Sequence, residues 1–509
     1  MRTKTNRRRM GLALGIWIGI LGAPIISVRG ADAPPLREKK VYVILWFDTE
    51  DYILPASDDA ALKVAEFLTR QKVRATFKVV GEKARVLEKR NRTDVIAALK
   101  QHEIGYHANF HSVQPSPAMY LSSLNWDEGV AEFDRREGPG RKDIQRIFGT
   151  DPTCYGQPGS SWGPQAYGAM RQWHMPVYLD SGSHVNLADK PCYYCSILNL
   201  YKLAHTLRAD LRNRDMKPAE DAFLKARNKL VAEGGGVISI YYHPCEFVHK
   251  EFWDGVNFRN GANPPREEWK LPATKTEEES KLAYDVFEQY LRFIKRFPEV
   301  QLITASEAAK LYRDRARGRK FTAAEIRAVA ANVSEDVTFQ KHEDFALAAS
   351  EAFALLHQYL VEMNLSRKVE TIELKTTPLG PAHSTPPLME EIRTERNQFW
   401  RTIMDVGNYL QTHKRIPTTV WLGSVAVPPE AYFAALARFA IAIIDGRPLP
   451  DSVTIKPAKL AVAAHVADDS PKLWGWVIFP RGFSAPAMME LAKRQAWTLK
   501  PALLDGMAN

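Results

Sequence analysis

Short apolar runs, rich in β-branched and aromatic residues, alternate with amphipathic stretches over the first three hundred residues of the chain. Runs of four to seven such residues between polar segments are typical of buried strands, and the stretches between them have the spacing of one-sided helices. The predicted strands are residues 41–47, 74–80, 103–106, 153–156, 175–180, 236–242 and 300–304. Their regular alternation with helices indicates a parallel α/β barrel.

The pattern becomes mostly helical after residue 319. Thr322 followed by Glu325 has the spacing of a helix capping box. A faint internal repeat links residues 345–356 to residues 431–441, and a tail with mixed strand and helix patterns follows. The tail carries Trp474 and Trp476, to which the sequence assigns no role. The expected organisation is a signal peptide (1–30), a linker (31–39), a barrel (40–315), a helical region (320–450) and an α+β tail (451–509).

The first thirty residues have the pattern of an export signal. Three consecutive arginines at positions 7–9 precede an apolar stretch at 11–23, which Pro24 closes. The residues before Ala31 are small or β-branched, so cleavage is expected there. An uncleaved membrane anchor over 10–28 is the alternative. Either way the chain is expected to be exported, to the periplasm, the cell surface or the medium.

Charge and cysteine content narrow the class further. The formal net charge of +10 includes six basic residues in the first thirty, and without them 63 basic residues face 59 acidic ones. A near balance of basic and acidic residues does not indicate nucleic-acid binding. In an exported chain, the four cysteines favour disulfides over thiolate metal sites, with three pairings open. They are Cys154, Cys192, Cys195 and Cys245.

Acidic and imidazole side chains follow several of the predicted strands. Asp48 and Glu50 come at the end of the first strand, and His107 and His111 follow the third. Two histidines four residues apart share one face of a helical turn. Together with one carboxylate, they make a three-ligand set with an open coordination position, which is typical of a hydrolytic metal centre.

Two further polar residues belong to the same rim. Asp180 ends the fifth predicted strand and His243 follows the sixth. Because the carboxyl ends of parallel strands meet at one rim of a barrel, we expect all of these side chains to converge. Strand alternation places Asp48 and Glu50 on one face and Asp51 on the other, so Asp51 is expected in a turn or at a helix start.

A loop at 246–272 carries four large aromatic residues and is long enough to be a lid or a binding loop. Its aromatic side chains either stack on sugar rings or pack the loop down, and the sequence leaves both alternatives open. The four are Phe247, Trp253, Phe258 and Trp269.

In the order of these motifs, residues 40–315 resemble the metal-dependent polysaccharide deacetylases. The matching segments are 47–51, 107–112, 155–159, 179–181 and 241–246. The resemblance implies a distorted (β/α)7 barrel, followed here by a mostly helical region and a small α+β tail. It also implies hydrolysis of N- or O-acetyl groups on an acetylated polysaccharide.

The resemblance also implies roles for individual residues. Asp48 would be the general base, and Glu50, His107 and His111 would hold one divalent metal, most simply Zn2+. His243 would be the general acid, with Asp180 orienting it and keeping it protonated. Predicted substrate contacts are Tyr155, Pro158 and Gly159, and Trp253 of the aromatic loop.

The third motif departs from the family. Gly156 stands where the family has an arginine that steadies the base. Without a cationic partner the base would have a higher pKa and looser positioning. Slow turnover, a substituted partner (Arg74 or Lys78) and a barrel that binds sugar without cutting it are the alternatives.

Residues 409–420 and the helix after them loosely resemble the cell-wall-binding repeats of pseudomurein-binding proteins, which would imply a cell-wall polymer as a partner. A plain structural helical domain is the alternative. For the whole chain, the first hypothesis is an exported polysaccharide deacetylase. A non-catalytic carbohydrate-binding or envelope-binding protein is the second, and a hydrolase of other C–N bonds, as in cyclic-amide hydrolases, is the third.

Overall fold

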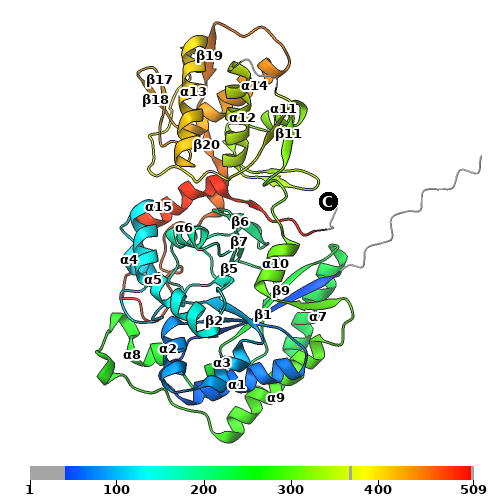
Figure 1. Ribbon diagram of the computed structural model, residues 1–509, viewed down its shortest axis with the longest axis vertical. Coiled ribbons are helices and arrows are strands. Elements are labelled where there is room, and N and C mark those ends of the chain that lie inside the picture. Colours follow the sequence, from blue (N-terminus) through cyan, green and yellow to red (C-terminus); the bar gives the residue numbers. More distant parts are fainter. Residues whose placement is uncertain (1–39, 366–368, 506–509) are drawn as a thin grey trace, which may run out of the picture. The chain divides into compact units, whose positions relative to one another are not determined.

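The computed structural model describes residues 40–365 and 369–505. The expected signal peptide and linker, residues 1–39, lie outside the described residues. A curled mixed sheet with surrounding helices comes first along the chain, and a mostly helical region follows it (Figure 1). The predicted α/β class and the order of the two regions are therefore confirmed.

Strand β1 (Val41–Thr49) is the centre of the sheet. It pairs in parallel with β9 (Gly236–Tyr242) along one edge, from Val41 opposite Gly236. Along the other edge β10 (Val300–Ile303) pairs with its first half and β2 (Thr76–Val79) with its second half. A strand with neighbours on both edges and cover on both faces needs a continuous apolar run, which this segment has.

The sheet continues from β2 through β3 (Glu103–Tyr106), β4 (Cys154–Tyr155) and β5 (Val177–Leu179), all parallel. All seven predicted strands are thus present. The described sheet has four more strands, each two to four residues long. They are β6 (Cys192–Tyr194), β7 (Ile197–Leu200), β8 (Thr206–Leu207) and β21 (Lys500–Pro501). β6 runs antiparallel to β7 and to β21, which makes the sheet mixed.

Amphipathic helices cover the sheet. The buried face of α1 (Ala56–Arg70) includes Val64, Phe67 and Leu68, three and four residues apart as the helical period requires. Helix α9 (Glu277–Ile294) starts at a capping box in which Thr276 and Glu279 satisfy each other's backbone N–H groups. The other long helices of this region are α2 (Gly81–Lys89), α3 (Thr93–Leu99), α5 (Trp126–Phe148), α6 (Gln165–Gln172) and α7 (Lys217–Ala232).

The helical region has a hydrophobic core of its own. Its main helices are α11 (Ala323–Ala331), α12 (Ala349–Asn364), α13 (Arg396–His413) and α14 (Pro429–Ile444). The predicted capping box of Thr322 and Glu325 starts α11. The two halves of the faint repeat fall largely in α12 and α14, where Phe353 and Tyr432 contact each other in the core. No comparison supports the resemblance to pseudomurein-binding repeats.

The tail returns from the helical region to the sheet. Val466 forms a bridge to Val185, and β21 pairs with β6 at the edge of the sheet. Trp474 and Met488 belong to the core of the first region, whereas Trp497 belongs to the core of the second. The tail therefore completes the packing of both regions.

All four cysteines are free and buried, which corrects the expectation of disulfides. They lie in β4, in the β6–β7 hairpin and just after β9, and the first three, Cys154, Cys192 and Cys195, fill core space as small apolar groups. Among the described residues, no helix has the length and apolar character that crossing a membrane requires.

Candidate metal centre

Glu50, His107 and His111 converge at the carboxyl end of the sheet. Glu50 is the first residue after β1, and His107 is the first after β3. Oε2 of Glu50 lies 2.9 Å from Nε2 of His111 and 3.5 Å from Nε2 of His107. All three side chains are buried, and their ligand atoms lie within 4.8 Å of one another. The predicted ligand set is thus brought together.

The two histidines do not share a helical turn, which corrects that part of the prediction. Residues 107–111 form bends and an open turn, and His111 has a φ of 57°. This left-handed conformation costs a residue other than glycine roughly 1 kcal/mol. His111 is held there by a 2.6 Å hydrogen bond between its Nδ1 and Oγ of Ser112. Nδ1 of His107 donates to the carbonyl oxygen of Gly156 at 2.9 Å, which leaves the lone pair of its Nε2 facing Glu50.

The three residues fit a divalent metal. Nε2 of His111 is buried and has no hydrogen-bond partner in good geometry, although Glu50 is close. Burial alone would raise the pKa of Glu50, but the neighbouring imidazoles of His111, His243 and His107 lower it well below its ordinary value. Glu50 is therefore ionised, as a ligand must be. Two imidazole nitrogens and one carboxylate oxygen are donors that Zn2+ accepts.

Beside this centre, Lys78 holds two carboxylates. Its Nζ lies 2.9 Å from Oδ1 of Asp48 and 2.6 Å from Oδ2 of Asp180, and its side chain is completely buried. Lys78 is opposite Asp48 in the ladder between β2 and β1, so the strand register itself sets the contact. Burial alone would lower the pKa of Lys78, but Asp180 and Asp48 raise it above its ordinary value. The lysine is therefore charged and balances the two acids.

Gly156 leaves room for that ammonium group. A Cβ at position 156 would lie 2.1 Å from Nζ of Lys78 and 2.4 Å from Oδ2 of Asp180. Any side chain there would displace the lysine. Arg74, the other candidate for a substituted partner of the base, is exposed. Of the two alternatives, the structure supports Lys78.

His243 follows β9 and completes the rim. Its Nε2 lies 3.7 Å from Oδ2 of Asp48 and 3.8 Å from Oε2 of Glu50. Its Nδ1 lies 2.6 Å from Oε1 of Glu246, so the partner that orients it is Glu246 and not Asp180 as expected. Burial alone would lower the pKa of His243, but Glu50, Glu246 and Asp48 raise it to about 9.

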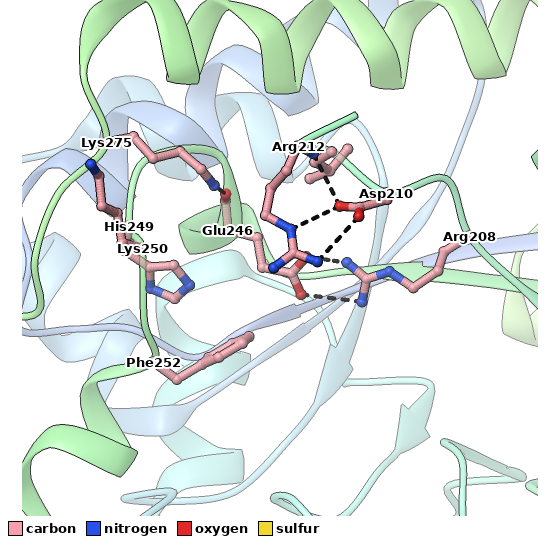
Figure 2. A pocket seen from close by; sticks show the side chains of 9 residues that line it. Arg208, Asp210, Arg212, Glu246, His249, Lys250, Phe252 and Lys275 are labelled. Carbon is pink, nitrogen blue, oxygen red and sulfur yellow. Dashed lines mark hydrogen bonds and ion pairs between the residues drawn. The ribbon is translucent and has the colours of Figure 1, made fainter. Parts of the chain in front are cut away.

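Glu246 also has a cationic partner on its other side. Arg208 makes an ion pair with it at the wall of a second cavity of about 460 Å³, next to the metal centre (Figure 2). Arg212 and Asp210 pair in the same wall at 2.9 Å. Burial alone would raise the pKa of Glu246, but its hydrogen bond to His243 and the charges of His243 and Arg208 lower it to about 2. Arg208, Glu246 and His243 thus form a chain that leads to the rim.

The rim opens into a cavity of about 550 Å³. It is lined by Asp48, Glu50, His107, His111, Asp180 and His243, together with Gly159, Phe252, Asp254 and Trp476. Of the predicted substrate contacts, Gly159 lines this cavity, whereas Tyr155 and Pro158 are buried and do not. Trp253 is fully buried and packs against Tyr52 and Phe258, which corrects its prediction as a sugar platform.

Trp476 is the aromatic residue that the tail contributes to the cavity, which Trp46, Tyr241 and Phe252 also line. Its indole N–H donates to Oδ2 of Asp254 at 2.6 Å, and its ring lies edge-on to His111 at 5.2 Å. A Cβ at Gly159 would lie 2.2 Å from the indole, so the absence of a side chain at this position leaves room for the ring. The two tryptophans in a polar tail are the one signal in the sequence. The sequence does not predict that the tail returns to the rim of the barrel.

Comparisons with known proteins give weak matches. No protein-family model matches the chain, and no curated protein does. Among solved structures, a Mycobacterium smegmatis protein assigned as a polysaccharide deacetylase shares 14% identity over 55% of this chain and 91% of its own, with a TM-score of 0.36. PuuE allantoinase shares 11% over 55% and 93%, with a TM-score of 0.35. A mutant of peptidoglycan deacetylase PdaC from Bacillus subtilis shares 17% over 53% and 91%, with a TM-score of 0.27. At these values none of the matches assigns a function, so the chemistry rests on the donor set of the site.

Proposed function

We propose that the chain is an exported, metal-dependent hydrolase that removes acetyl groups from an N-acetylated or O-acetylated polysaccharide. The observation that carries the proposal is the convergence of the Glu50, His107 and His111 ligand set with Asp48 and His243 on one cavity. A ligand set alone would suit a structural metal. A carboxylate and a protonated imidazole that both face the same ligands suit hydrolysis.

Glu50, His107 and His111 would hold the metal, with Zn2+ the simplest choice. When bound, such an ion polarises an acyl carbonyl and lowers the pKa of water at the open coordination position. Asp48 accepts the proton of the attacking water through Oδ2, because its Oδ1 is held by Lys78. The buried ammonium of Lys78 fixes the position of this carboxylate beside the ligand set.

The leaving group has to receive a proton, whereas the attacking water has to lose one. An amine leaves a tetrahedral intermediate only after protonation, so an acid has to face the scissile bond. His243 is protonated below pH 9 or so, because its pKa is raised to about 9. Its Nε2 donates that proton to the leaving nitrogen or oxygen, while Glu246 holds Nδ1 and fixes the ring.

The lining of the cavity supports a sugar polymer as the substrate. Acids and histidines line it together with Phe252 and with Trp476, which is partly exposed. An aromatic ring beside polar groups suits a sugar, which has both C–H faces and hydroxyl edges. Export, which the first thirty residues predict, would bring the chain to envelope or extracellular polymers.

The proposal is tested by acetate release from N-acetylated chito-oligosaccharides and from peptidoglycan. We expect release by the full chain and a loss of at least about 100-fold in Asp48→Asn, since general-base catalysis contributes 10²–10⁴-fold. Asp59→Asn, in an exposed position of α1, is the matched control and should keep full activity. Sugar binding without acetate release from any acetylated polymer or ester would contradict the proposal and favour the non-catalytic alternative.

A further inference from the structure

A second cluster of metal-binding side chains lies beside the first. Asp51, Cys245 and His249 offer one carboxylate oxygen, one sulfur and one imidazole nitrogen within 4.8 Å of one another. Their side chains are 1%, 1% and 3% exposed. They come from the end of β1, from the short helix η1 (Pro244–Phe247) and from the loop after it. None of them has a part in the proposed hydrolysis.

The charge of Lys83 acts on the carboxylate of Asp51, but the ion pair that Lys83 forms is with Asp58. Its Oδ1 accepts from the backbone N–H groups of Ile53 and Leu54, both at 3.0 Å, whereas its buried Oδ2 has no partner. The ammonium of Lys83 donates to the backbone carbonyl of Asp51 at 2.6 Å and pairs with the carboxylate of Asp58 at 2.5 Å. A buried carboxylate oxygen without a partner is costly, and a cation placed there removes the cost.

His249 and Cys245 offer the complementary donors. Nδ1 of His249 is buried without a hydrogen-bond partner. This nitrogen lies within reach of the carboxylate of Asp51 and the sulfur of Cys245, so its lone pair could bind the same ion. Cys245 is a free thiol on the same turn, whose backbone carbonyl accepts from the N–H of His249 at 2.9 Å. This hydrogen bond fixes the backbones of the two residues relative to each other.

We propose that Asp51, Cys245 and His249 bind a second Zn2+ with a structural role. Zn2+ takes sulfur, nitrogen and oxygen ligands together, and a water molecule can fill the fourth tetrahedral position. The S–H bond of Cys245 breaks, a sulfur–zinc bond forms and the proton leaves to solvent. His249 also lines the second cavity beside Phe252, which gives the ion a path from solvent (Figure 2).

Strand geometry explains how two metal sites can lie so close together. Consecutive residues of an extended segment point to opposite sides, so Glu50 serves one site and Asp51 the other. The second ion would tie η1 to the end of β1. Because His243 and Glu246 flank Cys245 in the sequence, this link would hold the general acid in place.

The test uses the full chain and Co2+ as a spectroscopic probe. A cysteine ligand gives a sulfur-to-cobalt charge-transfer band in the near ultraviolet, and the Glu50 site has no sulfur. We expect wild type loaded with Zn2+ to hold two ions per chain, and Cys245→Ser and His249→Gln to hold one. The Co2+ protein should show the band in wild type and lose it in Cys245→Ser. Cys192→Ser, at another buried free cysteine, is the matched control and should keep both the band and the second ion.

The outcome separates this proposal from the proposed function. His107→Ala should lose one ion and retain the band, because it damages only the catalytic site. A wild-type chain that shows no band and binds one ion, which His107→Ala abolishes, would overturn the second site and leave the first intact. A band that persists in folded Cys245→Ser, with folding checked by circular dichroism, would also overturn it.

Discussion

Lys78 and Gly156 act as a pair. The lysine enters the space that a side chain at 156 would fill, and it touches Asp48 and Asp180 at once. The sequence places two basic residues, Arg74 and Lys78, in the predicted strand 74–80 and does not distinguish between them. Only the register of β2 against β1, which places Lys78 opposite Asp48, decides between them.

Replacing Lys78 by methionine should therefore abolish most activity. The change keeps the approximate length of the side chain but removes the charged partner that positions Asp48 and Asp180, so we expect kcat/KM to fall at least about 100-fold. Loss of one partner of a buried ion pair should also lower the free energy of unfolding by about 3–5 kcal/mol. Acetate release and urea unfolding measure the two effects. Lys63→Met, an exposed lysine on α1, is the control, and equal activity in the two variants would contradict the role of Lys78.

The partner of His243 determines the alkaline limit of activity. Glu50, Glu246 and Asp48 face the imidazole and raise its pKa above the ordinary value, so the acid form is lost as the pH rises through that raised pKa. Glu246→Gln removes the closest of these charges. We expect the alkaline limb of the pH profile of kcat/KM to move down by about one pH unit or more, since a charge-assisted hydrogen bond contributes roughly 1.5–3 kcal/mol. An unchanged limb would mean that His243 is not the acid, and Glu288→Gln on the exposed face of α9 should leave the profile unchanged.

At the scale of elements, the sequence predicts where the main strands lie better than it predicts which strands pair with them. The seven main strands lie in mostly apolar runs, which residues such as Lys78, Glu103 and Gln301 interrupt only singly, so their pattern is detectable without the fold. Strands β6, β7, β8 and β21 have two to four residues each and pair through contacts that no local pattern encodes. The rim residues were predictable because each follows a predicted strand. The partner of His243 was not, because Glu246 reaches it through the turn of η1.

Trp476, from the C-terminal tail, lines a cavity most of whose other lining residues come from the first region of the chain. Trp476→Ala removes an aromatic face and a hydrogen bond to Asp254, but no group that reacts. We expect KM for an acetylated oligosaccharide to rise about tenfold, which corresponds to roughly 1.4 kcal/mol, with a smaller change in kcat. Trp476→Phe should recover part of the loss. Trp421→Ala, at an exposed tryptophan of the helical region, is the control, and an unchanged KM in Trp476→Ala would contradict a substrate contact.

At the scale of the whole molecule, the barrel region includes residues beyond its predicted boundary at residue 315. The tail supplies the edge strand β21 and core residues that include Trp474 and Met488. A fragment of residues 40–318 would expose the apolar surface that these residues cover. We expect it to aggregate or to melt without a cooperative transition, whereas residues 40–505 should be monomeric or form a defined oligomer. Size-exclusion chromatography and thermal unfolding measure this, and a stable fragment with full activity would contradict it.

The most direct test of the central claim is acetate release by the full chain before and after metal removal. The chain is stripped with a chelator, and Zn2+ is then added back while acetate release from one N-acetylated oligosaccharide is measured. We predict no release from the stripped protein and recovery on addition of Zn2+, with no recovery in His111→Ala and full recovery in His174→Asn, at an exposed loop histidine. Undiminished release by the metal-free chain would contradict the account, and so would recovery in His111→Ala.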